Sequence, residues 1–512
     1  MKKLNIPSLE ITKANFIKHA KSYEDFNEDL CDKFFANDAI VLQEKLLEYD
    51  ELMQSSYLER NWTKSYLSTR APLAIASNFC FKLPKQYDLN DFICTFSNLV
   101  IAYEEGKLEY KTARGDEIFP RQFDILKGGA RIPKPLSDEF RLNYKNTRFF
   151  SVLHNNNLYK VDICKNIGLK NNFKDDFKAI SFAHLSLLNS DEASKFYQKY
   201  EDYNPFFEVI ENSRFNICII NKDFNSINEE VHYMQYHAPC YHYKTLNFIY
   251  NEKNKNIYIN AEHSFLDGGT IAYILEYIDA NLISPNELKE PYFVEQYFDD
   301  EYIKSIQEGL KAYNNLSFNA NFSFDLAQDF GFSKDFILQA AIVNASKNAY
   351  KKYVCQYEAV DMRVYDYGRT ECVRAISLEL QAALKSFNKD DFVKANNEHK
   401  TRIKDCKKAC GIDRHLLGLK TLIPCIENKY AKEFFNSKMY KNTCETIVST
   451  SSLGKSNFVD VFYFHPVCEN GIGVSYAYYE GKCYFTLTYF DENILNGFKD
   501  GLAEFFDKFN NL

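Results

Sequence analysis

Apolar residues follow two different spacings along the chain, and one change of spacing frames the most informative segment. Residues 257–261 read Ile-Tyr-Ile-Asn-Ala, a β-branched and aromatic run that is typical of a strand. In residues 270–281 the apolar side chains recur every three or four positions, which predicts a helix. A pair of glycines, Gly268 and Gly269, marks the turn between them. The pattern therefore predicts a loop between strand and helix, a place where a rigid scaffold often holds functional groups.

The same two patterns alternate through the rest of the chain. Helices are predicted over residues 10–70, with amphipathic stretches around 38–57, over 301–353 and over 494–509. Strands are predicted at residues 147–153, 158–163, 215–220, 446–449, 459–464, 473–478 and 483–489. No solenoid-type repeat or low-complexity linker interrupts these elements. The chain is therefore expected to be α/β throughout, and composition marks no domain boundary.

Composition and charge limit the class of protein. The 512 residues are 46% hydrophobic and 26% charged, an ordinary balance for a globular protein with a sizeable core. This length suits one very large domain or two to three ordinary ones. The net charge is −8 and no run of Lys and Arg is dense enough for a nucleic-acid surface, so no nucleic-acid partner is expected. No apolar run approaches the roughly 18–20 residues of a membrane span.

The cysteines and histidines suggest neither a metal site nor a disulfide framework. The 14 cysteines contain no Cys-x-x-Cys pair, which favours reduced, mostly buried thiols. His232, His237 and His242 are spaced by five, which suits neither one helix face nor one strand face, so no metal site is expected. The first residues are basic without an apolar segment behind them, and the end carries no peroxisomal or ER address. A cytoplasmic location is therefore expected.

The loop after the strand at 257–261 carries His263 and, four positions later, Asp267. An imidazole with an unperturbed pKa of roughly 6.5 can take a proton from a hydroxyl and return one to a leaving group. A neighbouring carboxylate can orient it. The alternative is a buried structural histidine hydrogen-bonded to the aspartate. Taken alone, the pair does not decide between these interpretations.

Three downstream segments favour the catalytic interpretation. The first reads Tyr-Glu-Ala at residues 357–359 followed by Gly-Arg-Thr-Glu-Cys-Val-Arg at 368–374. The second reads Gly-Ile-Asp-Arg-His-Leu-Leu-Gly-Leu-Lys at 411–420. The third reads Ser-Thr-Ser at 449–451, followed by Phe-His-Pro-Val at 464–467 and Gly-Ile-Gly-Val-Ser-Tyr at 471–476. In order and approximate spacing, this set resembles the carnitine/choline acyltransferase family. Shorter segments at 6–9, 62–67 and 131–133 are also similar to family segments. The resemblance covers nearly the whole chain, with shortened loops.

The resemblance implies a fold and a reaction. The fold would be two α/β domains, each related to chloramphenicol acetyltransferase, with a tunnel between them. Residues 85–300 would form the domain that carries the catalytic histidine, and residues 1–84 with 301–512 the other. The reaction would be reversible transfer between acyl-coenzyme A and carnitine, without a covalent acyl-enzyme. The substrates would be these two small molecules, with coenzyme A as substrate or product and no separate cofactor, and a monomer is expected.

The resemblance also assigns roles to residues. His263 would be the general base, with Asp267 beside it, and Ser451 the donor to the developing oxyanion. Ser449 would contact substrate. Tyr357, Thr370 and Arg414 would bind the carnitine carboxylate, for which a guanidinium is a natural partner. Members that use choline have Asn in place of this Arg and Val in place of this Thr, so the chain resembles the carnitine side. By itself, Arg414 would more readily be read as a salt-bridge partner of Asp413.

Five positions bear on the donor and the acyl group. The family binds coenzyme A with lysines before a Ser-Pro-Asp helix start. Here Ser333, Lys334 and Asp335 occupy that start, and the preceding lysines are absent. Phosphate binding should be weaker, so a carrier-protein-bound donor is an alternative. Phe462 aligns with a bulky residue of short-chain members, which predicts short or medium acyl groups. His465 replaces a glycine beside the active strand and would reshape the tunnel. The further alternatives are another hydroxylated acceptor and a non-enzymatic acyl-binding relative.

Overall fold

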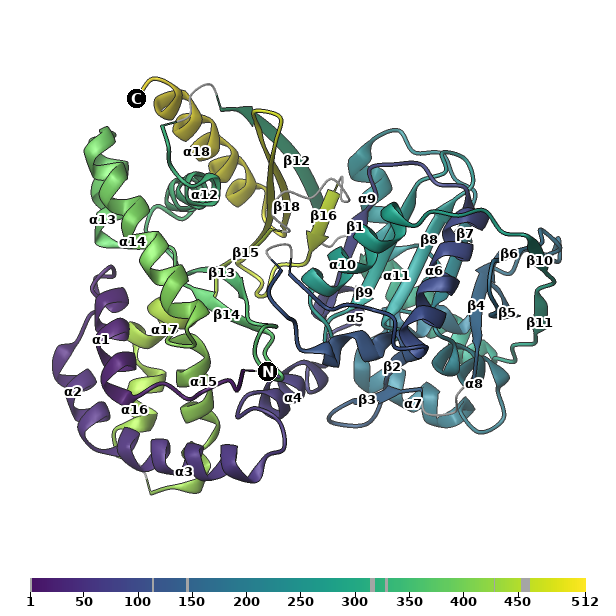
Figure 1. The fold of residues 1–512 in the computed structure, drawn as a ribbon, viewed down its shortest axis with the longest axis horizontal. Coiled ribbons are helices and arrows are strands. Elements are labelled where there is room, and N and C mark those ends of the chain that lie inside the picture. The colour runs from purple at the N-terminus through teal and green to yellow at the C-terminus, as the bar shows by residue number, and fades with distance from the viewer. Residues whose placement is uncertain are drawn as a thin grey trace.

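A computed structural model describes residues 2–112, 115–143, 147–313, 318–326, 330–427, 429–452 and 461–512. Two large sheets organise this part of the chain, and helices cover both (Figure 1). The mixed α/β class with two sheet-containing domains agrees with the prediction from sequence.

The first sheet has eight strands. In spatial order they are β11 (Tyr292–Val294), β5 (Asn157–Asp162), β4 (Phe149–His154), β7 (Asn216–Ile220), β8 (Leu246–Asn251), β9 (Ile257–Glu262), β1 (Asn78–Lys82) and β16 (Val461–Phe464). β1 and β16 lie outside the range 85–300 predicted for this domain. β16 pairs with β1 antiparallel, with Phe462 opposite Phe81 and Phe464 opposite Phe79. The C-terminal half of the chain therefore contributes the last strand of the first sheet.

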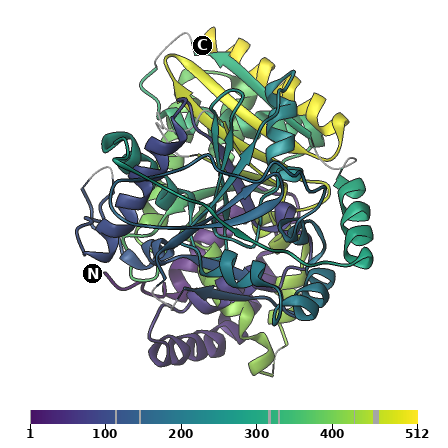
Figure 2. The ribbon, with the colours of Figure 1, turned by 90° about the vertical axis from the view of Figure 1, so that its right-hand side faces the viewer.

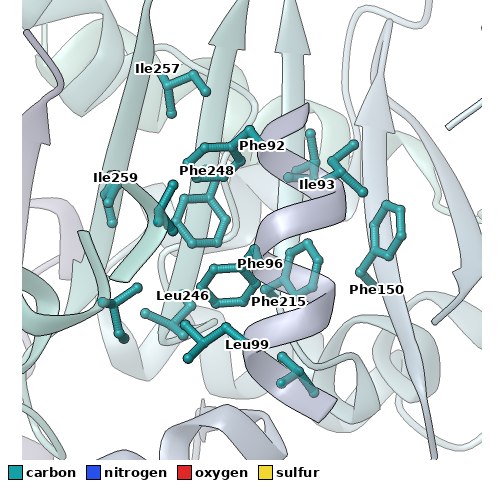
Figure 3. Packing of buried hydrophobic residues seen from close by; sticks show 14 of the residues in the cluster. Phe92, Ile93, Phe96, Leu99, Phe150, Phe215, Leu246, Phe248, Ile257 and Ile259 are labelled. Carbon is teal, nitrogen blue, oxygen red and sulfur yellow. The ribbon is translucent and has the colours of Figure 1, made fainter. Parts of the chain in front are cut away.

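Both faces of the eight-stranded sheet are buried, because alternate residues of a strand point to opposite sides. Leu246 and Phe248 of β8 belong to one apolar cluster, whereas Ile249 belongs to the cluster on the other face. Helix α6 (Leu89–Glu104) covers the first face. Its Phe92 and Phe96 lie against Phe248 with ring centroids 5.0 and 4.8 Å apart (Figure 3). Such two-sided burial explains the nearly continuous apolar runs of these strands.

Helices and short strands complete this domain. They are α5 (Leu73–Ala76), η1 (Pro120–Lys127), β2 (Gly129–Ile132), β3 (Glu139–Leu142), β6 (Ile167–Leu169), η2 (Phe182–Leu187), α7 (Ser190–Tyr200), α8 (Pro205–Asn212), α9 (Ile227–Tyr236), α10 (Gly268–Ala280), β10 (Glu287–Lys289) and α11 (Asp300–Tyr313). No helix among the residues that the structure describes is both long and apolar enough to cross a membrane.

The second sheet has six strands. In spatial order they are β12 (Phe318–Asp325), β18 (Lys482–Tyr489), β17 (Ile472–Tyr479), β15 (Val448–Ser451), β13 (Gln356–Asp361) and β14 (Thr370–Val373). Helices α12 (Lys334–Tyr350) and α18 (Glu492–Asn510) pack on this sheet, and Figure 2 shows α18 at the top of the molecule beside the yellow strands. The remaining helices are α1 (Leu9–Ala20), α2 (Glu28–Ala36), α3 (Asp38–Leu52), α4 (Glu59–Leu67), α13 (Leu378–Ser386), α14 (Lys389–Lys407), α15 (Asp413–Thr421), η3 (Ile423–Cys425), α16 (Ala431–Asn436) and α17 (Lys438–Cys444).

The structure corrects the prediction that residues 301–353 are helical throughout. β12 separates α11 from α12 and pairs antiparallel with β18. Its sequence, Phe-Asn-Ala-Asn-Phe-Ser-Phe-Asp, alternates apolar and polar residues with the period of a strand, and helical patterns on both sides obscured this signal. β15 also begins two residues later than the predicted strand at 446–449, so that it includes Ser451.

Candidate active site

His263 lies on the loop between β9 and α10, as the sequence predicts. Its Nδ1 is 2.6 Å from the carbonyl oxygen of Leu266. A carbonyl can only accept, so Nδ1 carries the proton and Nε2 is the basic nitrogen. Burial lowers the pKa of His263 from its ordinary value, although Asp267 opposes this shift. The imidazole is therefore neutral, and able to accept a proton, at neutral pH.

Asp267 does not contact the imidazole at hydrogen-bond distance, because its Oδ1 is 3.8 Å from Nδ1. Its ion pair is with Arg369, at 2.9 Å, and Gln122 donates to its other oxygen at 2.7 Å. Burial opposes ionisation of this carboxyl, but the Arg369 and His263 charges and these hydrogen bonds lower the pKa of Asp267 to about 2. The carboxylate thus stays charged and supports His263 electrostatically rather than by a direct bond.

Arg369 is a residue of the site to which the sequence analysis assigned no role. Its guanidinium donates to the carbonyl oxygens of His263, Ser264 and Leu266 at 2.7, 2.6 and 3.1 Å. It therefore fixes the backbone of the loop that carries His263 as well as Asp267. Arg369 is the middle residue of the Gly-Arg-Thr segment that carried the family resemblance, and this was the signal available in the sequence.

A second buried charge network holds the start of the loop. Glu262, fully buried, accepts hydrogen bonds from the backbone and hydroxyl of Ser264 and from Ser77. The Arg131 guanidinium lies 3.4 Å from Glu262 and 2.7 Å from Asp138. A buried carboxylate with this many partners is well compensated, which favours a rigid loop. The Arg-Ile-Pro segment noted in the sequence thus has a structural role behind His263.

Aromatic rings flank the imidazole. The rings of Tyr66 and Phe79 lie edge-on to His263, with centroids 5.2 and 4.9 Å away. Phe79 also contacts Phe462, at 6.3 Å, and Phe462 packs on Phe81 at 4.6 Å. The predicted acyl-length residue is therefore one aromatic ring away from the imidazole. His465 lies elsewhere, buried between Tyr236 and Phe490, and burial lowers its pKa to about 4.

The structure brings together the three residues predicted to bind a carboxylate. Arg414 donates to the Tyr357 hydroxyl at 3.1 Å, to the Thr370 hydroxyl at 3.4 Å and to the Thr370 carbonyl at 2.8 Å. Its guanidinium also stacks on Trp62, 3.9 Å from the ring centroid. Asp413 does not take Arg414 as its partner; it pairs with Arg374 at 2.8 Å. The salt-bridge interpretation of Arg414 is therefore wrong.

A cavity of about 410 Å³, including the space at its mouth, adjoins this guanidinium. Its wall includes Trp62, Arg369, Thr370, Glu371 and Arg414. The Arg369 guanidinium also lies 5.6 Å from the Trp62 ring centroid. The indole of Trp62 thus lies beside both guanidiniums, that of Arg414 and that of Arg369, which holds the loop of His263.

The serine-containing strand lies next to this cluster. In β15, Ser449 is opposite Tyr357 of β13, and Ser451 is opposite Ser475 of β17. Ser449 and Ser451 share one face of the strand because they are two residues apart. Tyr357 lies on that face too, since it is in register with Ser449. The backbone pairing therefore brings Ser449 and Tyr357 side by side although they are almost a hundred positions apart in the sequence.

The residues predicted to contact the donor lie at the start of α12. Ser333 is its N-cap residue, the Lys334 ammonium lies 5.1 Å from the Tyr478 ring, and Asp335 accepts a hydrogen bond from Tyr476 at 2.8 Å. Residues 327–329 of the predicted donor segment lie outside the described residues.

Among the residues that the structure describes, one group has the spacing of metal ligands. The group consists of Asp335, Glu358 and His399, whose ligand atoms lie within 4.8 Å of one another. His399 Nε2 is 2.8 Å from Glu358, and burial raises the pKa of Glu358 to about 7 despite the opposing His399 charge. A carboxyl that holds its proton near neutral pH can share it with its neighbours, so hydrogen bonding alone accounts for the group.

Comparison with known proteins extends this picture. The family model described as Choline/Carnitine o-acyltransferase matches residues 4–504. Carnitine O-acetyltransferase from Homo sapiens is 23% identical over 565 aligned positions, which cover 95% of this chain and 88% of that protein. A putative acetyltransferase from Mycoplasma pneumoniae is 29% identical over 287 positions, 49% of this chain and 46% of that protein. The chain thus spans about half the length of that bacterial relative.

Solved structures also align with this chain. TRI3 trichothecene 15-O-acetyltransferase from Fusarium sporotrichioides aligns with a TM-score of 0.41 at 10% identity, over 88% of this chain and 93% of that one. The epimerization domain of tyrocidine synthetase B aligns with a TM-score of 0.38 at 10% identity, over 85% of this chain and 92% of that one.

Proposed function

Because the chain belongs to the choline/carnitine O-acyltransferase family, we propose that it moves a short or medium acyl group reversibly between acyl-coenzyme A and the hydroxyl of carnitine. The observation that carries the choice of acceptor is the cluster of Arg414, Tyr357 and Thr370 beside Trp62. We call these four residues the acceptor side. The guanidinium donates to hydroxyls and a carbonyl, and among the described residues no carboxylate lies within ion-pair distance of it, although the nearby Glu371 accepts from the Arg414 backbone. A guanidinium placed in this way can pair with an anionic ligand.

In the proposed reaction, Nε2 of His263 takes the proton of the acceptor hydroxyl as its oxygen attacks the thioester carbonyl. The hydroxyl of Ser451 stabilises the negative charge that develops on the carbonyl oxygen. Collapse of this tetrahedral species breaks the carbon–sulfur bond and forms the ester. The imidazolium then returns its proton to the leaving thiolate, so the histidine ends as it began. The Leu266 carbonyl keeps the imidazole in the required tautomer, and Arg369, paired with Asp267, holds that carbonyl in place.

The donor end, which consists of Ser333, Lys334 and Asp335, supports a second candidate for the donor. The segment 325–335 contains one lysine, Lys334, and three aspartates. A segment of this charge attracts nucleotide phosphates weakly. A thioester whose pantetheine arm is carried by a protein lacks the adenosine phosphates and would not need that attraction. This alternative changes the donor and leaves the chemistry at His263 unchanged.

The test is release of free thiol from a panel of acyl-coenzyme A donors, from acetyl to palmitoyl, with and without carnitine. The proposal requires thiol release that depends on carnitine and is fastest with short or medium donors. Rapid release without any acceptor, or carnitine-independent rates for every donor, contradicts it. Binding of acyl-coenzyme A with no release would instead favour an acyl-binding role.

A further inference from the structure

A chain of polar side chains crosses the apolar core behind the serine-containing strand. Thr450 points to the opposite face from Ser449 and Ser451, because it lies between them on β15. It is buried, with 1% of its surface exposed, and its hydroxyl donates to the carbonyl oxygen of Tyr357 at 2.7 Å. The strand that carries the oxyanion serine is thereby tied to the strand that carries an acceptor residue.

Gln339 of α12 is the hub of this chain, and every polar atom of its amide has a partner. Its Nε2 donates to the Thr450 hydroxyl and to the Tyr476 hydroxyl, both at 2.9 Å. Its Oε1 accepts from Gln356 of β13. The side chain is buried with 1% of its surface exposed, among apolar neighbours such as Ile337. Burying an amide this deeply is unfavourable unless all of its hydrogen bonds are made, and apolar residues would fill the same space.

The far end of the chain reaches the donor end. The Tyr476 hydroxyl donates to Asp335 Oδ1 at 2.8 Å, in the first turn of α12. Asp335 also lies beside Glu358, which follows Tyr357 on β13. A continuous path of hydrogen bonds therefore runs from Asp335 through Tyr476 and Gln339 to Thr450, and so from the start of α12 to the back of β15.

We propose that Tyr476 and Gln339 are positioning residues for the transfer reaction. Through Thr450 they set the placement of β15, and hence of the Ser451 hydroxyl. They also connect that strand to the donor end. The inference rests on the function proposed above. Neither residue touches the reacting atoms. Their effect would be on the geometry of the oxyanion donor, where a displacement of 1 Å can cost on the order of a hundredfold in rate.

The first experiment does not need a substrate. Tyr476→Phe keeps the ring and removes the hydroxyl that joins Gln339 to Asp335. Amide hydrogen exchange of the full chain should become roughly two- to tenfold faster in residues 448–451, because the hydroxyl loses its hydrogen bond with Gln339, which leads on to Thr450, as well as its bond with Asp335. Tyr302→Phe is the matched control. It removes a buried hydroxyl bonded to the Ser181 carbonyl at 3.0 Å, in the other domain, and should leave this segment unchanged. Unchanged exchange in the Tyr476 variant, or the same change in both variants, overturns the proposal.

The second experiment measures turnover. Tyr476→Phe should lower kcat by about tenfold with little change in the KM of the acceptor. Gln339→Met, which keeps the length of the side chain, should act in the same direction. In a Ser451→Ala background the Tyr476 change should cost nothing further, because the group it positions is gone. Additive losses overturn the proposal. If Ser451→Ala alone leaves kcat unchanged, the role proposed for Ser451 fails, and the exchange experiment still decides whether the network holds the strand.

Discussion

On the acceptor side, Arg414 is held by two hydroxyls, a carbonyl and the Trp62 ring, whereas the donor end offers a single lysine that lies over a tyrosine ring. The first arrangement is preorganised for a planar anion, because its guanidinium is already oriented before a ligand binds. In the second arrangement, the segment 325–335 contains one cation and three aspartates. Under the proposed function, this contrast predicts that the fold itself sets specificity for the acceptor, while binding of the donor depends less on phosphate charge.

His263, which belongs to neither the acceptor side nor the donor end, should show the largest effect. His263→Ala should lower kcat by about 10²–10⁴, the range typical of general-base catalysis, because the variant lacks the nitrogen proposed as the base. The KM values for donor and acceptor should change little. Steady-state kinetics on both substrates measures this. Near-normal turnover in the variant would make His263 a structural residue.

The next effect sharpens the acceptor side. Arg414→Asn should reduce kcat/KM for carnitine by roughly ten- to a hundredfold, which corresponds to losing about 1.5–3 kcal/mol from a charge-assisted hydrogen bond. The KM of the donor should be spared. Relative use of choline should rise, because a cation that repels a quaternary amine has been removed. Tyr302→Phe serves again as a control for lost stability. Loss of donor binding in place of acceptor binding would show that Arg414 has been assigned to the wrong substrate.

An effect of about the same size is expected for the choice of acyl group. Phe462→Gly removes a ring packed on Phe81 and Phe79, beside the imidazole. The opening should raise kcat/KM for long acyl donors relative to acetyl, by roughly ten- to a hundredfold if several methylenes are newly buried. A donor series from acetyl to palmitoyl measures the ratio. An unchanged ratio means that another residue limits the acyl length.

The smallest effect is expected at the donor end. A large effect there would contradict the contrast drawn between the acceptor side and the donor end. S-acetylpantetheine lacks the nucleotide phosphates of acetyl-coenzyme A. With so few cations at the start of α12, its KM should be within about tenfold of that for acetyl-coenzyme A. Lys334→Ala should shrink even this difference. A loss of several hundredfold with acetylpantetheine would locate strong phosphate binding elsewhere on the protein.

Local patterns predicted some parts of the molecule well and others not at all. The strand–loop–helix unit around His263 was predictable because the strand spacing, the glycines and the helix spacing all lie within 25 residues. β12 was missed because its alternation covers only eight residues between two helical patterns. The correct class of the fold followed from the mixture of both spacings.

The candidate site shows the same limit more clearly. The residues that the resemblance assigned to carboxylate binding do lie together around Arg414. They could be named from the sequence because each lies in a recognisable segment. The ion pair of Arg369 with Asp267 joins positions 102 residues apart, and no local pattern encodes it. The hydrogen bonds from Gln339 to Thr450 and Tyr476 span 111 and 137 residues. Such contacts depend on how helices and strands pack, so only the structure shows them.

The measurement that tests the acceptor side most directly is competition between carnitine and choline for acetyl transfer by the unmodified protein. With acetyl-coenzyme A as donor, the ratio of kcat/KM values should favour carnitine by at least about tenfold, because only carnitine offers a carboxylate to Arg414. A preference for choline, or equal use of both alcohols, would contradict the assignment of Arg414, Tyr357 and Thr370 to carboxylate recognition.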